Sequence, residues 1–288
     1  MEQSFLKELI KEQKNEITAH YIYKKLAQRI KSSENKGILQ AISVDEIKHY
    51  RKLKEITEVE LRPDMLKVYF FYYLSLILGL TFGIKLLEKD EASAIQKYQD
   101  LARTDPAFHE VLKDEEEHEK MLISMINEER LRYMGSIVLG LNDALVELTG
   151  ALAGYTFAFQ NAKLIALTGL ITGIAASFSM ASAEYLSSKQ DNSTRESLKS
   201  ALYTGAAYVI TVVLLILPYL LLSNPYISLG ITLSVVLLII FLFNYYVAIA
   251  KDLDFKVRFI EMSVISLGVA AASFLVGVIV KNSFGIDI

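Results

Sequence analysis

Cysteine is absent from this sequence of 288 residues. Its absence excludes disulfide bonds, thiolate zinc sites, iron–sulfur clusters and a rubredoxin-type centre. A strong charge imbalance is also lacking, because the formal net charge is only −3, and this argues against nucleic acid or another polyanion as a partner. Residues 1–14 are charged and lack the apolar core of a signal peptide, so we expect no cleaved leader.

The charged residues are distributed unevenly along the chain. Lysine and glutamate are concentrated in residues 1–132, whereas residues 133–288 are overwhelmingly apolar. The 52% hydrophobic fraction is therefore an average over two different halves. We predict an all-α protein with two domains, residues 1–130 and residues 131–288.

Four helices are predicted in the first half, over about 3–31, 35–61, 65–103 and from 105 onward. In each of them, acidic residues or an acid with a histidine fall inside the apolar stripe. Buried carboxylates are costly unless they are paired or bind metal. The candidate metal ligands are Glu16, Glu46 with His49, Glu88 with Glu91, and Glu115 with His118.

The spacing of these residues indicates one shared metal centre. A Glu-x-x-His pair places both side chains on one helix face, and two such pairs with glutamates from two further helices form the ligand set of di-iron bundles. Oxygen-rich ligation with one imidazole per metal suits iron or manganese, and zinc is a further candidate occupant. A single pair would more often be a solvated surface. His20 is interpreted as an outer or exposed residue, and Glu12 as a residue of the bundle rim.

These motifs resemble the rubrerythrin branch of the ferritin-like superfamily over about residues 1–130. The extra glutamate on the third helix is the feature shared with that branch. The resemblance implies a ferritin-like four-helix bundle with a di-iron centre. The chain lacks the cysteine-rich rubredoxin domain, so peroxidase turnover of the rubrerythrin type is not implied.

Residues 68–84 form a run of seventeen residues without a charge, close to the lower limit for a membrane span. An extra crossing here would separate Glu46 and His49 from Glu115 and His118. We therefore interpret the run as the start of the third helix, either buried or facing a partner, near the membrane surface.

Five membrane spans are predicted in the second half, at about 133–160, 163–186, 200–222, 226–250 and 258–281. Eight lysines and arginines flank them on one side and two on the other. This bias predicts a plasma-membrane protein with a cytosolic N-terminal domain and an external C-terminus.

Because no proline follows Pro106 before residue 160, residues 105–160 are predicted to form one helix that joins the domains.

Polar residues inside the spans are candidates for a transport pathway. Carboxylate and amide oxygens with one thioether fit a divalent transition metal better than magnesium, and the carboxylates can carry protons when metal leaves. Helix packing or an interfacial position is the alternative role, most plainly for Glu184 near the inner end of the second span and for Glu261 at the start of the last span. Glycine pairs at 150/154 and 169/173 allow close helix contact, either within the chain or across a dimer axis. The pathway candidates are Asn142, Asp143, Glu147, Met180 and Glu184.

Two segments resemble the vacuolar iron transporter family: residues 140–146, Gly-Leu-Asn-Asp-Ala-Leu-Val, and residues 179–187, Ser-Met-Ala-Ser-Ala-Glu-Tyr-Leu-Ser. The resemblance implies a homodimeric, proton-coupled exporter of iron(II) in which Asp143 and Met180 line the pore. This chain departs from the family at Ala144, where glycine is common, and at the additional Glu147. The linker at 189–199 is too short for the cytosolic insert of eukaryotic members. The whole chain is similar to membrane-bound ferritin-type iron exporters of bacteria and archaea.

We therefore predict a divalent metal efflux transporter for iron(II) or manganese(II), exchanging metal for protons. Its cytosolic bundle captures, senses or oxidises iron, which leaves ferroxidase or peroxidase activity open, and no catalytic residue is assigned. The competing hypothesis is a membrane-anchored di-iron oxidase or peroxidase whose spans serve as an anchor. A bare anchor needs neither five spans nor acids inside one of them.

Overall fold

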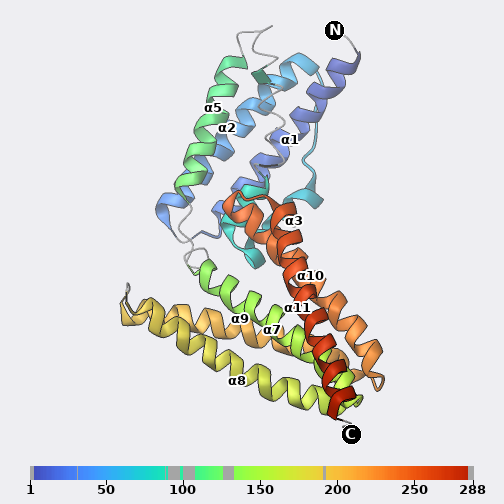
Figure 1. Ribbon diagram of the computed structural model, residues 1–288. Helices are drawn as coiled ribbons and strands as arrows, with labels where there is room; N and C mark the ends of the chain where they lie inside the picture. Colours follow the sequence, from blue (N-terminus) through green and yellow to red (C-terminus); the bar gives the residue numbers. More distant parts are fainter. Residues whose placement is uncertain are drawn as a thin grey trace. The chain divides into compact units, whose positions relative to one another are not determined.

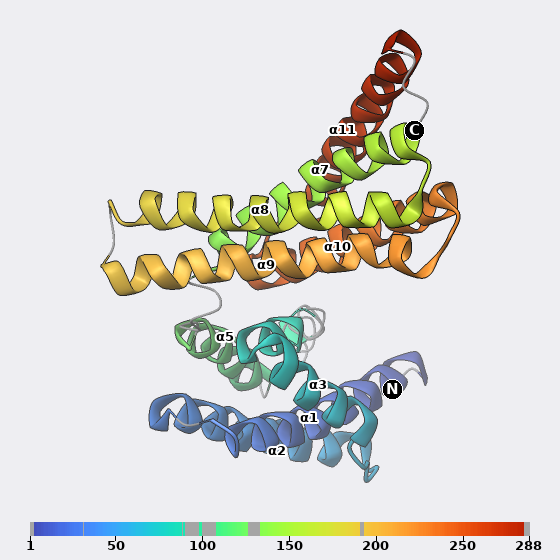
Figure 2. The same ribbon diagram turned by 90° about the horizontal axis from the view of Figure 1, so that it is seen from below.

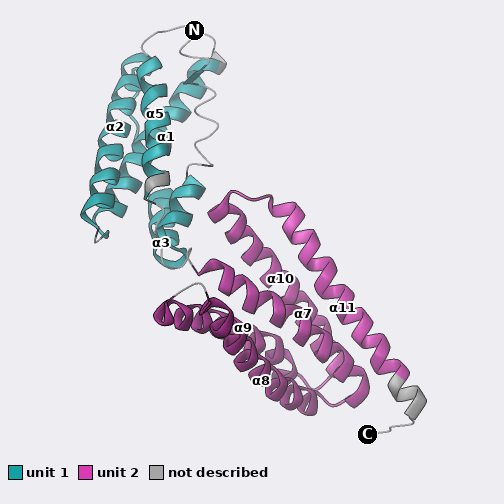
Figure 3. Cartoon of the chain, turned by 60° about the vertical axis from the view of Figure 1, so that its left-hand side comes forward, with its two compact units in different colours: residues 1–128 teal, residues 129–288 magenta. Residues whose placement is uncertain are grey.

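The computed structural model describes residues 3–30, 32–87, 89, 98–99, 108–125, 133–190 and 193–284. Every regular element among these residues is helical, which confirms the all-α prediction for them. The chain divides into two compact units, Met1–Glu128 and Glu129–Ile288 (Figure 3).

The first unit contains α1 (Gln3–Ala27), α2 (Ser33–Thr57), α3 (Met65–Leu78) and α5 (Phe108–Ser124). Helices α1 and α2 lie side by side (Figure 1). The side chain of Ser32 caps α2 by accepting from the Asn35 amide, and α2 ends at Glu58 in the left-handed conformation. Two apolar clusters hold the helices together. One contains Ile22, Leu39, Phe71 and Leu122, and the other contains Leu9, Leu53, Phe108 and Val111.

The third helix is interrupted at Gly79, so the prediction of one continuous helix over 65–103 is wrong. Gly79 has φ 104° and ψ 151°, a conformation that side chains with a Cβ rarely adopt. Helix resumes over residues 80–87, and Gly83 packs so closely that a Cβ there would lie 1.9 Å from Ser75 Oγ. The fourteen residues of α3 cover about 21 Å, less than the roughly 30 Å of a bilayer core. Glu88 and Glu91 lie outside the described residues.

The second unit contains α7 (Met134–Phe159), α8 (Ala162–Ser188), α9 (Thr194–Leu221), α10 (Pro225–Lys251) and α11 (Phe255–Phe284). All five are long and apolar enough to cross a membrane, which confirms the five predicted segments. Helices α8 and α9 run alongside each other (Figure 2). Helix α7 packs against α8, α9 and α11 and contributes Leu145, Leu148 and Leu152 to the core of this unit.

Two predicted boundaries differ from the structure. Helix α9 begins at Thr194, inside the predicted linker, because Ser193 and Glu196 form a reciprocal capping box. Helix α5 ends at Ser124 and α7 begins at Met134, so the prediction of one continuous helix over 105–160 is wrong. The Met125 amide bonds to the Leu122 carbonyl, an i→i−3 bond that tightens a final helical turn. Residues 126–132 and the predicted helix start at Asp105 lie outside the described residues.

The paired glycines make contacts within the chain. A Cβ at Gly150 would lie 2.9 Å from Ser273 Oγ on α11, and one at Gly169 would lie 2.8 Å from Leu152 Cδ2 on α7. Gly154 and Gly173 likewise approach α11 and α9. Of the two roles considered for these glycines, the structure shows packing of helices inside one chain.

Candidate metal centre and acidic residues of the apolar helices

Four predicted ligands meet in the middle of the first unit. Glu16 on α1, Glu46 and His49 on α2, and Glu115 on α5 each offer a ligand atom, and these atoms all lie within 4.8 Å of one another. The group sits between the two apolar clusters: along α1 it falls between Leu9 and Ile22. Glu16, Glu46 and His49 are buried, and the Glu115 side chain is 14% exposed.

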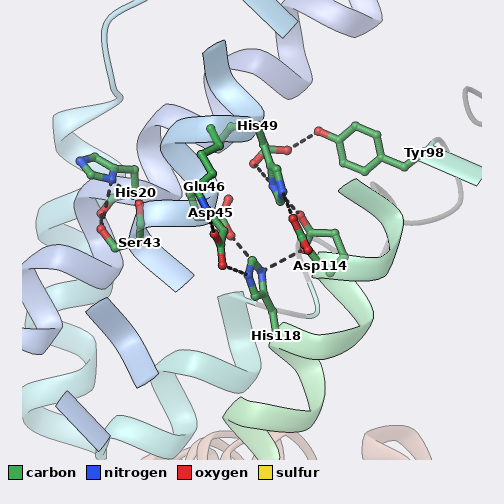
Figure 4. A network of polar contacts seen from close by, with 11 residues as sticks. His20, Ser43, Asp45, Glu46, His49, Tyr98, Asp114 and His118 are labelled. Atoms are coloured by element: carbon green, nitrogen blue, oxygen red, sulfur yellow. Dashed lines mark hydrogen bonds and ion pairs between the residues drawn. The ribbon is translucent and has the colours of Figure 1, made fainter. Parts of the chain in front are cut away.

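Glu115 lies between the two histidines of the site. Its Oε1 is 3.3 Å from His49 Nδ1, and its Oε2 is 3.8 Å from His118 Nδ1. Each histidine also faces one further glutamate: His49 Nδ1 is 3.6 Å from Glu16 Oε2, and His118 Nδ1 is 3.5 Å from Glu46 Oε1. The two imidazole rings are 6.0 Å apart between centroids. The structure therefore brings together five of the seven predicted ligands in a nearly symmetric arrangement (Figure 4).

Two aspartates contact the outer nitrogens of the same histidines. Asp114 Oδ2 lies 3.2 Å from His49 Nε2, and Asp45 Oδ2 lies 3.4 Å from His118 Nε2 (Figure 4). Each aspartate reaches across to the histidine of the other helix. A carboxylate on one ring nitrogen fixes the tautomer and the ring orientation, which leaves Nδ1 for the site. Sequence reasoning missed both residues, although Asp-Glu-x-x-His occurs twice, at 45–49 and 114–118.

The electrostatics of the metal-free site reflect this crowding of acids and imidazoles. Burial lowers the pKa of His49, but Glu115 and Glu16 outweigh it and raise the value to about 10. Burial raises the pKa of Glu115, but His118 and His49 outweigh it and lower the value to about 2. The pKa of His118 is likewise raised by Glu115 and Asp45 against the effect of burial. Without metal, the imidazoles carry the protons that hold these carboxylates together.

One observation indicates that these residues are suited to hold a pair of metal ions. The Nδ1 atoms of His49 and His118 are buried, and no described group makes a hydrogen bond with either of them. Each of these nitrogens faces two carboxylate oxygens at 3.3–3.8 Å without a well-formed hydrogen bond, so a metal ion between nitrogen and oxygen would complete the contacts of both. Imidazole nitrogens and carboxylate oxygens in this combination are ligands typical of iron and manganese.

Tyr98 is a further residue that sequence reasoning did not assign to the site. Its side chain is fully buried, stacks on Phe108, and donates a hydrogen bond to Glu16 Oε1 (Figure 4). Burial and the Glu16 carboxylate both raise the pKa of Tyr98 well above its usual value, so the phenol keeps its proton and can serve as a donor. The available signal was its spacing, because Tyr98 is seven residues after Glu91 and so falls on the same face of the third predicted helix.

The two residues considered at the margin of the site have different surroundings. His20 is half-buried, and its Nδ1 lies 2.6 Å from the carbonyl of Ser43, so that nitrogen is the donor (Figure 4). It therefore serves a contact between α1 and α2, as expected for an outer residue. Glu12 is only 3% exposed, so its interpretation as a rim residue is wrong. Asn15, one turn further along α1, donates a hydrogen bond to its carboxylate over 2.9 Å.

In the second unit, the predicted pathway residues of the first span lie on α7. Asp143 and Asn142 are half-buried, and Asn142 Oδ1 is a buried acceptor to which no described group donates. Glu147, one turn after Asp143, is exposed in the single chain and accepts a hydrogen bond from the Tyr208 hydroxyl on α9 over 2.9 Å. Tyr208 is fully buried, so it supports Glu147 from inside the helix bundle.

The two candidates on α8 have other neighbours. Met180 is partly buried against the apolar core that includes Ala144. Glu184 is half-buried and accepts a hydrogen bond from Ser136 Oγ over 2.8 Å. Ser136 precedes Asp143 by seven residues, about 10 Å along α7. The contact with Ser136 thus places the Glu184 carboxylate about two turns from Asp143 and about three turns from Glu147 along α7.

Fold and side chains together define a helical protein with five membrane-capable segments and an acid–histidine cluster of metal-binding type. Residues 134–198 of the chain match the VIT family. The matched segment covers α7, α8 and the first residues of α9, and so includes all five pathway candidates. No curated protein and no solved structure matches the chain. The family match and the apolar helices indicate a multi-pass membrane protein that transports metal ions.

Proposed function

We propose that this protein exports a divalent metal ion, iron(II) or manganese(II), in exchange for protons. The observation that carries the proposal is the acid pair Asp143 and Glu147 on α7, inside the segment that matches the VIT family. Carboxylates within an apolar span are costly, so their presence favours a function over a role in packing. Proton coupling follows from the same groups, because a carboxylate that releases metal can take up a proton.

The polar groups around Glu147 support a metal pathway along this part of α7. Tyr208 donates to one oxygen of Glu147 and so holds its orientation, while the second oxygen stays available. The orphaned Oδ1 of Asn142 supplies another hard ligand one residue from Asp143. In this proposal Met180 adds a soft thioether ligand, and Glu184, paired with Ser136, forms a separate step of the pathway.

A homodimer is part of the proposal. The Glu147 side chain is exposed in the single chain, although it belongs to a helix that is long and apolar enough to span a membrane. Contact of a carboxylate with lipid would be expensive. A second copy that covers this face of α7 removes that contact and doubles the number of carboxylates at the site.

The first unit acts in this proposal as a ferritin-like di-iron domain that captures metal before transport. His49 with Glu16 would hold one ion, His118 with Glu46 the other, and Glu115 lies between them. Bound iron would supply the redox capacity for a ferroxidase reaction, whereas the residues of this chain contribute binding and orientation. Asp45 and Asp114 fix the two imidazoles. Manganese and zinc are alternative occupants.

The proposed setting is the plasma membrane, with the first unit in the cytosol and the C-terminus outside. This orientation rests on the excess of lysine and arginine at the span ends on the side of the N-terminal unit. Metal bound by the cytosolic unit would then be on the correct side for export.

Metal flux in proteoliposomes tests the proposal. Asp143→Asn should abolish flux of iron(II) and manganese(II), while metal binding by the first unit stays intact. Glu261→Gln provides the matched control, because it makes the same change of acid to amide at an exposed position near the start of α11. Normal flux in Asp143→Asn would reject the transport function.

A second pair of variants tests the role of the cluster. Glu46→Ala with His49→Ala should remove metal from the first unit. Loss of flux at every metal concentration would indicate obligatory capture, and a shift in the concentration needed for half-maximal flux would indicate sensing. A membrane-anchored oxidase instead predicts metal-dependent oxygen consumption that survives in Asp143→Asn.

A further inference from the structure

Helix α3 exposes a continuous apolar and aromatic face. Leu66 is 85% exposed and Phe70 56% exposed, and Tyr69, Tyr73 and Leu76 are between 43% and 55% exposed. At 100° per residue these positions fall within an arc of about 120° on one side of the helix. Tyr69 and Tyr73 stack along it, with ring centroids 6.4 Å apart.

The opposite side of α3 already serves the core of the first unit. Val68 and Phe71 are 1% and 4% exposed and belong to the larger apolar cluster. The exposed face therefore takes no part in the packing of its own unit. Contiguous exposed apolar surface of this kind usually marks contact with a partner or a membrane.

Basic residues border the exposed face. Lys25 near the end of α1 places its Nζ 4.4 Å from the centroid of the Tyr69 ring and 4.9 Å from that of Tyr72. Arg29, one turn further, donates from Nε to the Tyr72 hydroxyl over 2.9 Å. Helix α3 itself contains a lysine and no acidic residue. Tyrosine beside apolar residues, with cations at the edge, is the composition of segments that lie in the membrane interface.

The first unit is joined through a short connection to helices that are long and apolar enough to cross a membrane. Ser124 at the end of α5 and Met134 at the start of α7 are ten residues apart, and an extended chain covers at most about 3.5 Å per residue. The end of α5 is thus tethered within roughly 35 Å of the start of a membrane-capable helix. Helix α3 is too short to cross a bilayer, and the break at Gly79 ends it, so contact within the interface plane is the geometry open to it.

We propose that the exposed face of α3, defined by Leu66, Tyr69, Phe70, Tyr73 and Leu76, rests on the surface of a bilayer that contains anionic lipids. The apolar and aromatic side chains enter the headgroup region, and Lys25 and Arg29 pair with anionic headgroups at its edge. A two-fold contact with a second copy fits less well, because it would bring the same cations toward one another. The proposal does not depend on which ion the protein transports.

Site-directed spin labelling of the full-length chain in lipid nanodiscs tests this contact, and the absence of native cysteine makes single-site labelling direct. A nitroxide at Phe70→Cys should be accessible to oxygen but several-fold less accessible to a water-soluble nickel chelate than a nitroxide at Phe5→Cys. Phe5 is a matched control, since it is an exposed phenylalanine of the same unit, about 30 Å along α1 from Lys25.

The charge requirement is tested with nanodiscs of phosphatidylcholine with and without phosphatidylglycerol. Protection at position 70 should depend on phosphatidylglycerol, and Lys25→Glu with Arg29→Glu should weaken it. Equal chelate accessibility at positions 70 and 5 would overturn the proposal. Protection from both reagents, with spin–spin broadening that disappears on dilution with unlabelled chain, would show that a second copy covers the face and would also overturn it. Protection that is the same in phosphatidylcholine alone would overturn the role of anionic lipid.

Discussion

Replacing Asp114 by alanine should weaken metal binding in the first unit without unfolding it. The Asp114 carboxylate lies 3.2 Å from His49 Nε2, on the side of the ring that faces away from the cluster. Alanine leaves the Nε2 proton without this acceptor and frees the ring to rotate. Loss of such an outer carboxylate typically costs 10–100-fold in metal affinity, about 1.4–2.7 kcal/mol.

Asp45 provides an internal comparison because it occupies the equivalent position on the other histidine. Its contact with His118 Nε2 is longer, at 3.4 Å, and Lys48 Nζ lies 2.6 Å from its other oxygen. Lys48 neutralises part of the negative charge, so Asp45 polarises its histidine less than Asp114 does. We therefore expect Asp45→Ala to weaken metal binding less than Asp114→Ala. Asp114→Asn keeps an acceptor and should have the smallest effect of the three.

Competition with a chelator measures these affinities on the purified full-length chain, with manganese(II) or with iron(II) under anoxic conditions. Glu116→Ala serves as the control, because Glu116 is an exposed acid on the same helix. Circular dichroism verifies that each variant keeps its helix content. An Asp114→Ala affinity equal to that of Glu116→Ala would refute the orienting role of Asp114. A larger loss for Asp45→Ala than for Asp114→Ala would refute the argument based on Lys48.

Three further predictions concern packing, protonation and the pathway. Gly140→Ala should lower the melting temperature in detergent, since its Cβ would lie 2.2 Å from a carbonyl oxygen of α9, whereas Gly230→Ala, with open space around it, should not. In the chelator-treated chain, the raised pKa of His49 stabilises the fold fully below its ordinary value of 6.5, and this stability is lost as pH rises toward 10. The melting temperature should therefore fall as pH rises from 6.5 to about 10, and it should fall less steeply in His49→Gln. Tyr208→Phe removes the hydrogen bond to Glu147 and should slow flux in proteoliposomes while metal binding by the first unit is unchanged.

The sequence predicted the broad architecture because its strongest signals are compositional. Runs of apolar residues longer than a bilayer thickness identify α7 to α11 without any knowledge of packing. The cluster of Glu16, Glu46, His49 and Glu115 could be predicted because charged residues inside an apolar stripe need a compensating partner. Both inferences rest on a free-energy cost, that of exposing apolar side chains to water or of burying charged ones without a partner.

The missed features depend on local backbone geometry or on contacts between helices. The break at Gly79 follows from one positive φ inside a run that is otherwise apolar and helical in pattern. The early start of α9 depends on a capping box formed by Ser193 and Glu196. Because these residues are polar, they were interpreted as part of the linker. Asp45 and Asp114 were missed because each acts on a histidine of another helix, 65 or more residues away in sequence. Comparing the two Asp-Glu-x-x-His motifs would have drawn attention to them.

The two acidic sites differ in a way that suits their proposed roles. In the first unit, carboxylates and imidazoles from α1, α2 and α5 converge, and aspartates contact both rings, so the candidate ligands are already arranged for the proposed capture of metal. Preorganised ligands of this kind favour tight and selective capture. On α7, Asp143 and Glu147 offer carboxylates with no imidazole beside them, and Glu147 is exposed in the single chain. A transport site must release its ion as readily as it accepts it. In the proposed homodimer, a site completed by the second copy, with carboxylates that can take up protons, meets that requirement better than a preformed cluster would.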